Sequence, residues 1–280
     1  MITEYLQDEE VVAACYNDNG VLSCSYLNYG VPPYWQILDP PAQKYDPWDT
    51  HSHYVSGGWL IFGNNGNNCC DKVCPAMNPT FSAELLSGKN GKWQQFSVEF
   101  PEGKLFPSWA CSVSLGMYKK VLITGGRNCD QAFSDALIMD LETGTLSYVT
   151  PMPGEMYEHS CILTETGEVL VAGGWRVNQQ RSGSFKLSSS YLYNVEKDKW
   201  RQIQDLPFDR YGTPRTPPKL FHLHGKTAVA AYAERVSTGI WTLEGSEWKL
   251  LDGGTIDLIS LISVTYLLPT NATIPCVTHH

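Results

Sequence analysis

Three arginines follow apolar segments at positions where a guanidinium could bind an acidic ligand. They occur in the dipeptides Gly126-Arg127, Trp175-Arg176 and Glu234-Arg235. A guanidinium binds carboxylate or phosphate through two parallel hydrogen bonds, so arginines gathered at one end of a fold would recognise such groups. The alternative is that each arginine forms an ion pair with an acidic residue on a neighbouring loop. The predicted binding set is Arg127, Arg176, Arg235, Asn64, Asn65, Asn128 and Trp175.

The nine cysteines are a second group whose chemistry could matter, and four of them fall in two loops: Cys69, Cys70, Cys74 and Cys129. In an oxidising compartment these four would form disulfides, whereas in a reducing one they would bind zinc as thiolates or stay free. We favour disulfides. By contrast, Cys15, Cys111 and Cys161 fall at one point of a recurring apolar strand, and we expect them to be small buried apolar residues.

Histidines recur near the start of the same strands, at His51, His53, His159, His222 and His224. His51 and His53 would share one face of a strand, because side chains alternate along it. Metal binding is one interpretation, and packing is the favoured one. We expect no metal site, no cofactor and no catalytic residue, because the sequence lacks Gly-x-Ser-x-Gly, His-Glu-x-x-His and a phosphate-binding glycine loop.

An internal repeat must position these residues. Each copy contains an apolar strand, a turn and a second apolar strand that usually ends in glycine, which is the pattern of a β-hairpin. The copies are VVAACYNDNGVLSCSY (11–26), HSHYVSGGWLIFGNN (51–65), ACSVSLGMYKKVLITGG (110–126), HSCILTETGEVLVAGGW (159–175) and LFHLHGKTAVAAYAER (220–235).

A second hairpin is predicted after the first in each copy, because a bulky residue is followed seven positions later by another, with turn-forming residues between them. The pairs are Leu86 with Trp93, Met139 with Leu146, Tyr193 with Trp200 and Trp241 with Trp248, and Trp35 takes the same place in the first copy. Trp35 and the second members of the four pairs, Trp93, Leu146, Trp200 and Trp248, are separated by 58, 53, 54 and 48 residues in turn. That period is the length of a four-stranded propeller blade.

Three features together resemble the kelch repeat. They are the strand ending in Gly125-Gly126 or Gly173-Gly174, the pair Tyr193 and Trp200, and a crossover containing proline, at Pro41, Pro101, Pro153 and Pro207. The resemblance implies an all-β fold, a kelch-type β-propeller with five recognisable blades and a partial sixth.

We expect one domain over residues 1–280, with blades near 11–41, 51–101, 108–153, 159–207 and 218–252 and a partial sixth over 256–280. Either residues 1–10 complete the sixth blade or the chain is truncated. A WD40 propeller is the alternative offered by Trp48-Asp49, but that dipeptide occurs once. An immunoglobulin-like sandwich would not require such a period.

Charge and composition limit the partners and the location. The net charge of -9 and pI near 5.2 argue against nucleic acid. No uninterrupted apolar run is long enough to span a bilayer, and MITEYLQDEE shows no signal peptide. Asn271 lies in a glycosylation sequon. We expect a monomer, and we lean toward a secreted or extracellular protein, with the cytoplasm as the alternative.

The favoured function is a non-catalytic scaffold that binds a peptide or protein segment, acidic in character, through loops at one mouth of the propeller. One alternative is a copper-dependent oxidase, because GEVLVAGG (167–174) is similar to blades of galactose-oxidase-like enzymes. No motif establishes the tyrosines and histidines that such an enzyme needs. A second alternative is an extracellular carbohydrate-binding propeller that uses Trp59 and Trp175.

Overall fold

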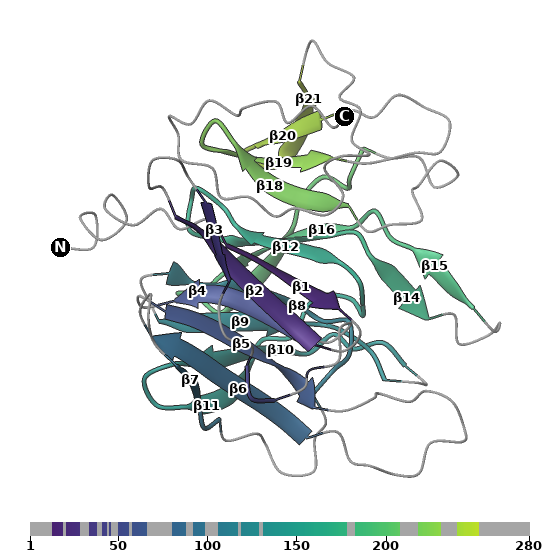
Figure 1. Ribbon diagram of the computed structural model, residues 1–280. Helices are drawn as coiled ribbons and strands as arrows, with labels where there is room; N and C mark the ends of the chain where they lie inside the picture. Colours follow the sequence, from purple (N-terminus) through teal and green to yellow (C-terminus); the bar gives the residue numbers. More distant parts are fainter. Residues whose placement is uncertain are drawn as a thin grey trace.

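The computed structural model shows an all-β protein (Figure 1). The residues that it describes are 13–18, 21–28, 34–37, 41–43, 45, 50–55, 58–65, 80–87, 92–98, 106–116, 119–128, 131–177, 183–207, 218–230 and 240–251. For 13–37 and for positions 54, 58, 59, 65, 80, 87 and 230, the description covers the backbone alone. In this part of the chain, no helix is long and apolar enough to cross a bilayer.

Several predicted features lie outside the described residues. They are Arg235, the loop cysteines Cys69, Cys70, Cys74 and Cys129, the sequon at Asn271, the dipeptide Trp48-Asp49 and the partial sixth blade.

The strands form antiparallel sheets in which most neighbours in the sheet are also neighbours in the sequence. Sheet 1 has three described strands, β1 (Ala13–Asp18), β2 (Val21–Asn28) and β3 (Tyr34–Ile37). Sheet 2 contains β4 (Thr50–Val55), β5 (Gly58–Asn65), β6 (Thr80–Ser87) and β7 (Trp93–Gln95). Sheet 3 contains β8 (Cys111–Ser114), β9 (Lys120–Thr124), β10 (Ala136–Asp140) and β11 (Thr145–Val149).

Sheets 4 and 5 are also four-stranded and antiparallel. Sheet 4 contains β12 (Ser160–Leu163), β13 (Val169–Ala172), β16 (Ser190–Asn194) and β17 (Lys199–Gln202). Between β13 and β16, β14 (Trp175–Val177) and β15 (Ser184–Lys186) pair with each other as a separate hairpin. Sheet 5 contains β18 (Lys219–Leu223), β19 (Lys226–Ala230), β20 (Ile240–Glu244) and β21 (Glu247–Leu250).

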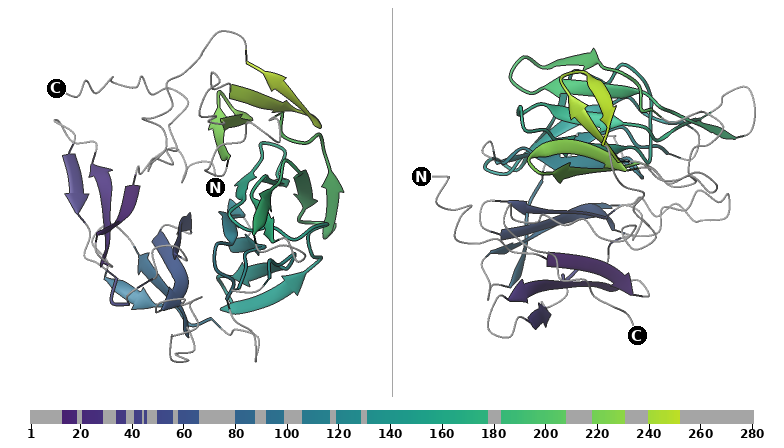
Figure 2. Two further views of the ribbon diagram at one scale, coloured as in Figure 1. Left: turned by 90° about the vertical axis from the view of Figure 1, so that its right-hand side faces the viewer. Right: turned by 90° about the horizontal axis from the view of Figure 1, so that it is seen from above.

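The sheets follow one another around a central region in chain order (Figure 2). The first strands of sheets 2 to 5 are the inner ones, because β4 contacts β8, β8 contacts β12 and β12 contacts β18. The fourth strands lie outermost and are largely exposed in β17 and β21. Sheets 3 and 4 therefore present both of their faces to neighbouring sheets.

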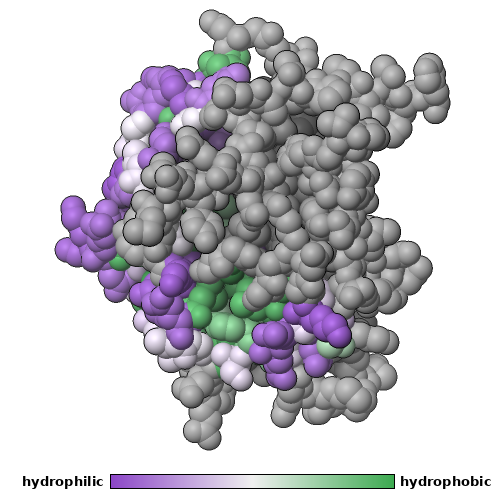
Figure 3. Space-filling model, turned by 60° about the vertical axis from the view of Figure 1, so that its left-hand side comes forward, coloured by the Kyte–Doolittle hydropathy of each residue, from purple (hydrophilic) through white to green (hydrophobic). Residues whose placement is uncertain are grey.

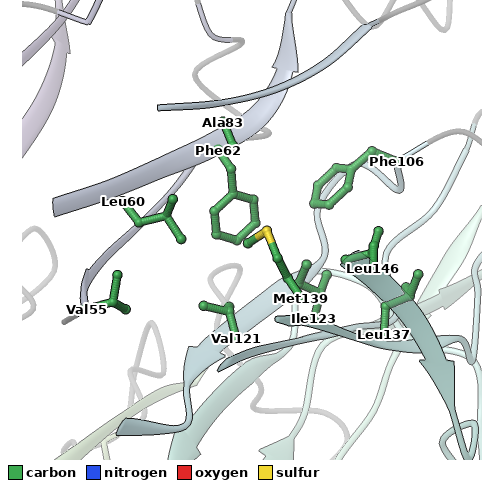
Figure 4. Close-up of a cluster of buried hydrophobic side chains, with 10 residues drawn as sticks. All are labelled: Val55, Leu60, Phe62, Ala83, Phe106, Val121, Ile123, Leu137, Met139 and Leu146. Atoms are coloured by element: carbon green, nitrogen blue, oxygen red, sulfur yellow. The ribbon is translucent and has the colours of Figure 1, made fainter. Parts of the chain in front are cut away.

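Burial on both faces explains the continuous apolar runs of the second strands, because alternate side chains enter different cores. Val121 and Ile123 of β9 pack with Phe62 of sheet 2, in the cluster drawn in Figure 4. Leu122, between them, packs with Val169 and other residues of sheet 4. A third cluster fills the space between sheets 4 and 5. On the face shown in Figure 3, hydrophobic side chains lie in a hollow bordered by hydrophilic ones.

Strand register confirms three of the four bulky pairs predicted for the second hairpin. The residues directly opposite one another are Leu86 and Trp93, Met139 and Leu146, and Tyr193 and Trp200. Trp241 and Trp248 also lie on the two strands of the predicted hairpin and in one core cluster, but they are not directly opposite one another: Trp248 faces Leu243 and Trp241 faces Leu250. The turn of this hairpin is shorter, with Gly245 at φ 66°, so the partner of Trp248 lies two residues closer in the sequence.

The structure also corrects the assignment of two cysteines as buried apolar residues. Cys111 of β8 and Cys161 of β12 form a disulfide, with their Cα atoms 6.0 Å apart and a sequence separation of 50. The two inner strands run next to each other around the central region, which brings the cysteine side chains of adjacent sheets together. The bond therefore joins sheet 3 to sheet 4.

Candidate functional site

The second strands of sheets 3 and 4 end in glycine pairs, and the residues after them are held by backbone pairing. Arg127 exchanges two backbone hydrogen bonds with Ser108, of 2.8 and 3.1 Å. Trp175 exchanges two with Tyr157, of 2.9 and 3.0 Å. Arg127 and Trp175 therefore occupy equivalent places one repeat apart. We call this end of the sheets, where β9 and β13 finish, the glycine end.

Left-handed backbone at the glycine pairs lets the chain pass very close to its neighbours. Gly173 and Gly174 have φ values of 73° and 84°. A Cβ on Gly174 would lie 2.6 Å from the carbonyl oxygen of Tyr157. Glycine is thus needed here both for its backbone conformation and for the close approach that places Trp175 beside Tyr157.

Arg127 lies against two aromatic rings at this end. Its guanidinium carbon is 4.8 Å from the ring centre of Trp109 and 5.0 Å from that of Tyr157. The two rings are stacked, with centres 5.8 Å apart, so the three groups form a nearly equilateral triangle. Arg127 also donates its Nε–H to the carbonyl of Asn128 at 3.0 Å. We name Trp109, Arg127 and Tyr157 the aromatic–arginine cluster.

One member of the aromatic–arginine cluster and one residue next to it have a strained backbone. Trp109 and Glu158 have φ values of 55° and 50°, in the left-handed region that bulky residues rarely adopt. Each lies two residues before the start of an inner strand, β8 or β12, and the N–H of Glu158 donates to the carbonyl of Trp109 at 2.9 Å. Such a conformation costs about 1 to 2 kcal/mol per residue, and strain of this kind gathers at functional sites.

Glu158 brings a carboxyl group beside this cationic cluster. Loss of solvent around the carboxyl raises its pKa, while Arg127 and a hydrogen bond to Trp175 act in the opposite direction. The site therefore combines one guanidinium, one half-buried carboxyl and three aromatic rings.

Arg176 lies at the same end but in a different setting. Arg176 comes one residue after Trp175, which is the residue equivalent to Arg127. Its guanidinium packs closely against Gly154, because a Cβ built on Gly154 would lie 2.8 Å from Nη2 of Arg176. Its Nε is buried and has no hydrogen-bond partner among the described residues. The structure thus brings Arg127 and Arg176 to one end of adjacent sheets without making them equivalent.

The predicted asparagines have local hydrogen-bonding roles in the described part of the chain. Asn64 is fully buried and donates to the carbonyl of Phe106 at 3.3 Å. Asn128 is exposed, and its side-chain oxygen accepts the N–H of Gln131 at 2.8 Å, which closes the loop after Arg127. The side chain of Asn65 lies outside the description.

The hairpin β14–β15 covers one flank of the site. The ammonium of Lys186 lies 5.1 Å from the ring centre of Trp175, and the hydroxyl of Tyr157 donates to Ser184 Oγ at 2.6 Å. Sequence reasoning missed Trp109, Tyr157, Glu158 and Lys186. The available signal was the aromatic residue before each inner strand, in SWAC (108–111) and MYEHSC (156–161).

The histidines form a separate group at the inner strands. Ser112 Oγ lies 2.8 Å from His51 Nδ1 and 2.7 Å from His53 Nε2, and Thr124 Oγ1 lies 2.8 Å from His159 Nε2. Loss of solvent lowers the pKa of His51 and His159 to about 3 and that of His53 to about 4. These imidazoles are therefore neutral at pH 7. Within the described ranges, no group of three or more acidic, histidine or cysteine side chains could hold a metal ion.

Comparison with known proteins identifies the fold and nothing further. No protein-family model and no curated protein sequence matches the chain. A solved structure titled "Structure of YjhT", of the β-propeller type, superposes with a TM-score of 0.58 over 86% of this chain and 83% of that one. The chain has a propeller-like all-β fold. The identity is 10%, so the likeness extends to the propeller-like arrangement of sheets and not to activity.

Proposed function

We propose that the chain is a kelch-type propeller of six blades, in which the five described sheets are joined by a sixth. The Gly-Gly strand ends, the Tyr193 and Trp200 pair and the repeat period support the kelch type. A ring also removes the exposed edges that an open row of sheets would leave.

The proposed role is a non-catalytic interaction scaffold that binds an acidic peptide or protein segment at the glycine end. The observation that carries it is the position of Arg127 over the rings of Trp109 and Tyr157. Stacking on aromatic rings restricts the orientation of a guanidinium. A guanidinium that is already ordered loses less side-chain conformational entropy when it binds a carboxylate. The strained backbone at Trp109 and Glu158 supports the same location.

A carbohydrate-binding role has less support at Trp175. The ammonium of Lys186 lies over its ring, so a sugar that stacked on that face would have to displace a cation. An acidic partner has no such conflict, because Lys186 and Arg127 both attract carboxylates.

We also propose that the protein resides in an oxidising compartment and is secreted. The Cys111–Cys161 disulfide supports this location, because structural disulfides persist in oxidising compartments and are rare in the cytosol.

Substitution of the two arginines tests the binding role. Partners isolated with the wild-type protein are titrated against Arg127→Ala, Arg176→Ala and the double variant. Loss of Arg127 should weaken binding of an acidic partner at least about tenfold, the usual effect of removing a charged hydrogen-bonding group.

Arg201→Ala is the matched control for that experiment. Arg201 is an arginine of β17 that pairs with Glu168 at 2.8 Å, in the turn at the other end of the inner hairpin of sheet 4. Its removal changes the net charge equally and should leave affinity unchanged. Equal losses for Arg127→Ala and Arg201→Ala would mean that general charge, and not the glycine end, attracts the partner. No loss for the double variant would refute the site.

A further inference from the structure

Arg176 carries a positive charge that the described residues leave without a counter-ion. Its side chain is only partly exposed, and its Nε–H is buried with no hydrogen-bond partner in the described part of the chain. None of the ion pairs found there involves Arg176, although Glu155 is next in sequence to Gly154, against which the guanidinium packs. A partly buried guanidinium without an acceptor is unfavourable, because it loses hydration and gains no hydrogen bond in return.

A second hydrogen-bonding group lies beside this guanidinium. A Cβ built on Gly154 would lie 2.8 Å from Nη2 of Arg176 and 3.7 Å from the hydroxyl of Tyr191, so both groups border the same small space. Tyr191 belongs to β16 and is largely buried, and its hydroxyl makes no hydrogen bond within the ranges that the structure describes. Guanidinium N–H and phenol O–H groups are both donors. Two such donors at one space favour an oxyanion.

Gly154 makes room for the guanidinium at this place. Gly154 is not among the glycines with a positive φ, so its backbone conformation does not require a glycine. The close approach of Arg176 does require one. Because the atom that a Cβ would meet is the far end of a flexible side chain, Gly154→Ala should displace the guanidinium and leave the fold intact. This substitution moves the charge without removing it.

An exposed apolar ring lies on the same face of the β14–β15 hairpin as Arg176. Phe185 is directly opposite Arg176 in the antiparallel register, so the two side chains point to one face. Phe185 is 44% exposed. Ser184, the residue before it, points to the other face, where it accepts the hydroxyl of Tyr157. Arg176 is therefore separated by the hairpin from the aromatic–arginine cluster.

We propose that Arg176 and Tyr191 bind a carboxylate of a peptide whose neighbouring apolar side chain covers Phe185. The planar guanidinium offers two parallel N–H donors to the carboxylate, and the phenol donates a third hydrogen bond. The carboxylate belongs either to an acidic side chain or to the end of a chain, and both have the same chemistry. This inference rests on the proposed function, since it specifies how one carboxylate of the acidic segment is held.

Fluorine NMR with the full chain and three small probes tests the proposal. Each probe contains para-fluorophenylalanine: the first is its N-acetyl form with a free carboxylate, and the second is its amide preceded by N-acetyl-glutamate. The third is the N-acetyl amide, which has no carboxylate. We expect at least one carboxylate probe to bind about tenfold more tightly than the third, because a charged hydrogen-bonded pair is added. The tighter of the two identifies the source as a chain end or an acidic side chain.

Three substitutions test the donors. Arg176→Gln should abolish the preference for carboxylate over amide. Gly154→Ala should weaken carboxylate binding about tenfold, because the guanidinium is displaced, and Tyr191→Phe about fivefold, because a neutral donor contributes less. Arg201→Gln is the matched control, since it removes the same charge from β17, and it should leave the affinity unchanged. Circular dichroism confirms that each variant is folded, and Tyr191→Phe decides the matter if Gly154→Ala does not fold.

Phe185→Ala tests the apolar part of the site. It should weaken binding of all three probes about fivefold, because the ring that it removes packs against the group that they share. Tyr148→Ala is its matched control, since Tyr148 is also 44% exposed and lies on the outer strand β11 of sheet 3. Affinity should not change in this control.

Each other outcome overturns the proposal. Equal affinity for the carboxylate and amide probes, or no binding of any probe, would refute the site. An equal loss in Arg201→Gln and Arg176→Gln would mean that general charge attracts the probes. Displacement of the carboxylate probe by a lower concentration of inorganic phosphate would assign the site to phosphate.

The proposed function and this inference fail separately. Loss of probe binding in Arg127→Ala with none in Arg176→Gln would place the carboxylate at the aromatic–arginine cluster and leave only the proposed function standing. If the probes bind through Arg176 while no isolated partner depends on either arginine, the carboxylate site stands and the proposed function is refuted.

Discussion

The indole N–H of Trp200 donates to the carbonyl of Thr150 at 2.7 Å, which ties the outer hairpin of sheet 4 to the chain leaving sheet 3. The carboxylate of Asp198 strengthens this joint by accepting the N–H of Thr150 at 2.9 Å. One repeat further on, the N–H of Gln204 donates to the carbonyl of Ser246 at 3.0 Å, and its side chain accepts the N–H of Trp248 at 2.8 Å. Neighbouring sheets are therefore joined at their outer parts by a recurring contact.

Trp200→Phe should lower the free energy of unfolding by about 1 kcal/mol beyond the loss of ring contacts, because the carbonyl of Thr150 loses its donor. Trp248→Phe is the matched control, since Trp248 occupies the same place in sheet 5 but its indole nitrogen is buried without a partner among the described residues. It should cost less. Urea denaturation compares the two variants, and an equal cost would argue against a stabilising role for the Thr150 contact.

The glycine end should tolerate no side chain at Gly174. Gly174→Ala must accept a positive φ and a contact with the carbonyl oxygen of Tyr157, so we expect a loss of about 3 kcal/mol. Gly167 also has a positive φ, 79°, but a Cβ there would meet nothing within 4 Å. Gly167→Ala should therefore cost only about 1 kcal/mol. Thermal unfolding of the two variants gives the comparison, and similar melting temperatures would contradict the close packing at this end.

Acidification should destabilise the fold through the inner-strand histidines. Their pKa values fall from about 6.5 when unfolded to about 3 for His51 and His159 and about 4 for His53. Because the folded pKa is lowered, the unfolded chain binds more protons between these limits. Stability is then complete above pH 6.5 and declines as the pH falls from there toward 4.

The slope of that decline identifies the residues responsible. Each histidine contributes about 1.4 kcal/mol per pH unit in this window, so His159→Asn should reduce the slope of unfolding free energy against pH by about that amount. Urea titrations at pH 7, 6 and 5 provide the measurement. A variant with the slope of the wild-type protein would mean that His159 is not neutral and buried in the folded chain.

Removing the disulfide should destabilise the protein without changing its sheets. The Cys111→Ala, Cys161→Ala double variant frees a loop of 50 residues in the unfolded chain, which corresponds to about 4 kcal/mol of chain entropy. Chemical denaturation measures the difference, and circular dichroism reports whether the sheets persist. An unchanged unfolding free energy would contradict a stabilising cross-link between sheets 3 and 4.

The sequence predicted the strands well because each sheet repeats the same apolar pattern. The pairing of Tyr193 with Trp200 and the glycine pairs after β9 and β13 followed directly from that period. Shifts of one or two residues in the alignment of one repeat with the next were harder to predict from the sequence. Cys111 faces Thr124 and Ser160 faces Ala172, so Ser160, and not Cys161, is the structural equivalent of Cys111. The disulfide arises from this one-residue shift between adjacent inner strands.

The candidate site was predicted only in part, because some of its residues precede the first strand of a hairpin and others follow the second strand. Arg127 was recognised after the second strand, but Trp109 and Tyr157 precede first strands of different repeats and meet it only through sheet pairing. The β14–β15 hairpin was not predicted, since WRV and SFK are too short to show a strand period.

Peptide mapping of the unreduced protein tests most directly the central claim that the repeats are sheets whose inner strands lie next to one another. We predict a cross-linked pair of fragments, one containing Cys111 and the other Cys161, that separates on reduction. Recovery of both cysteines as free thiols, or of either in a disulfide with a different cysteine, would contradict the arrangement.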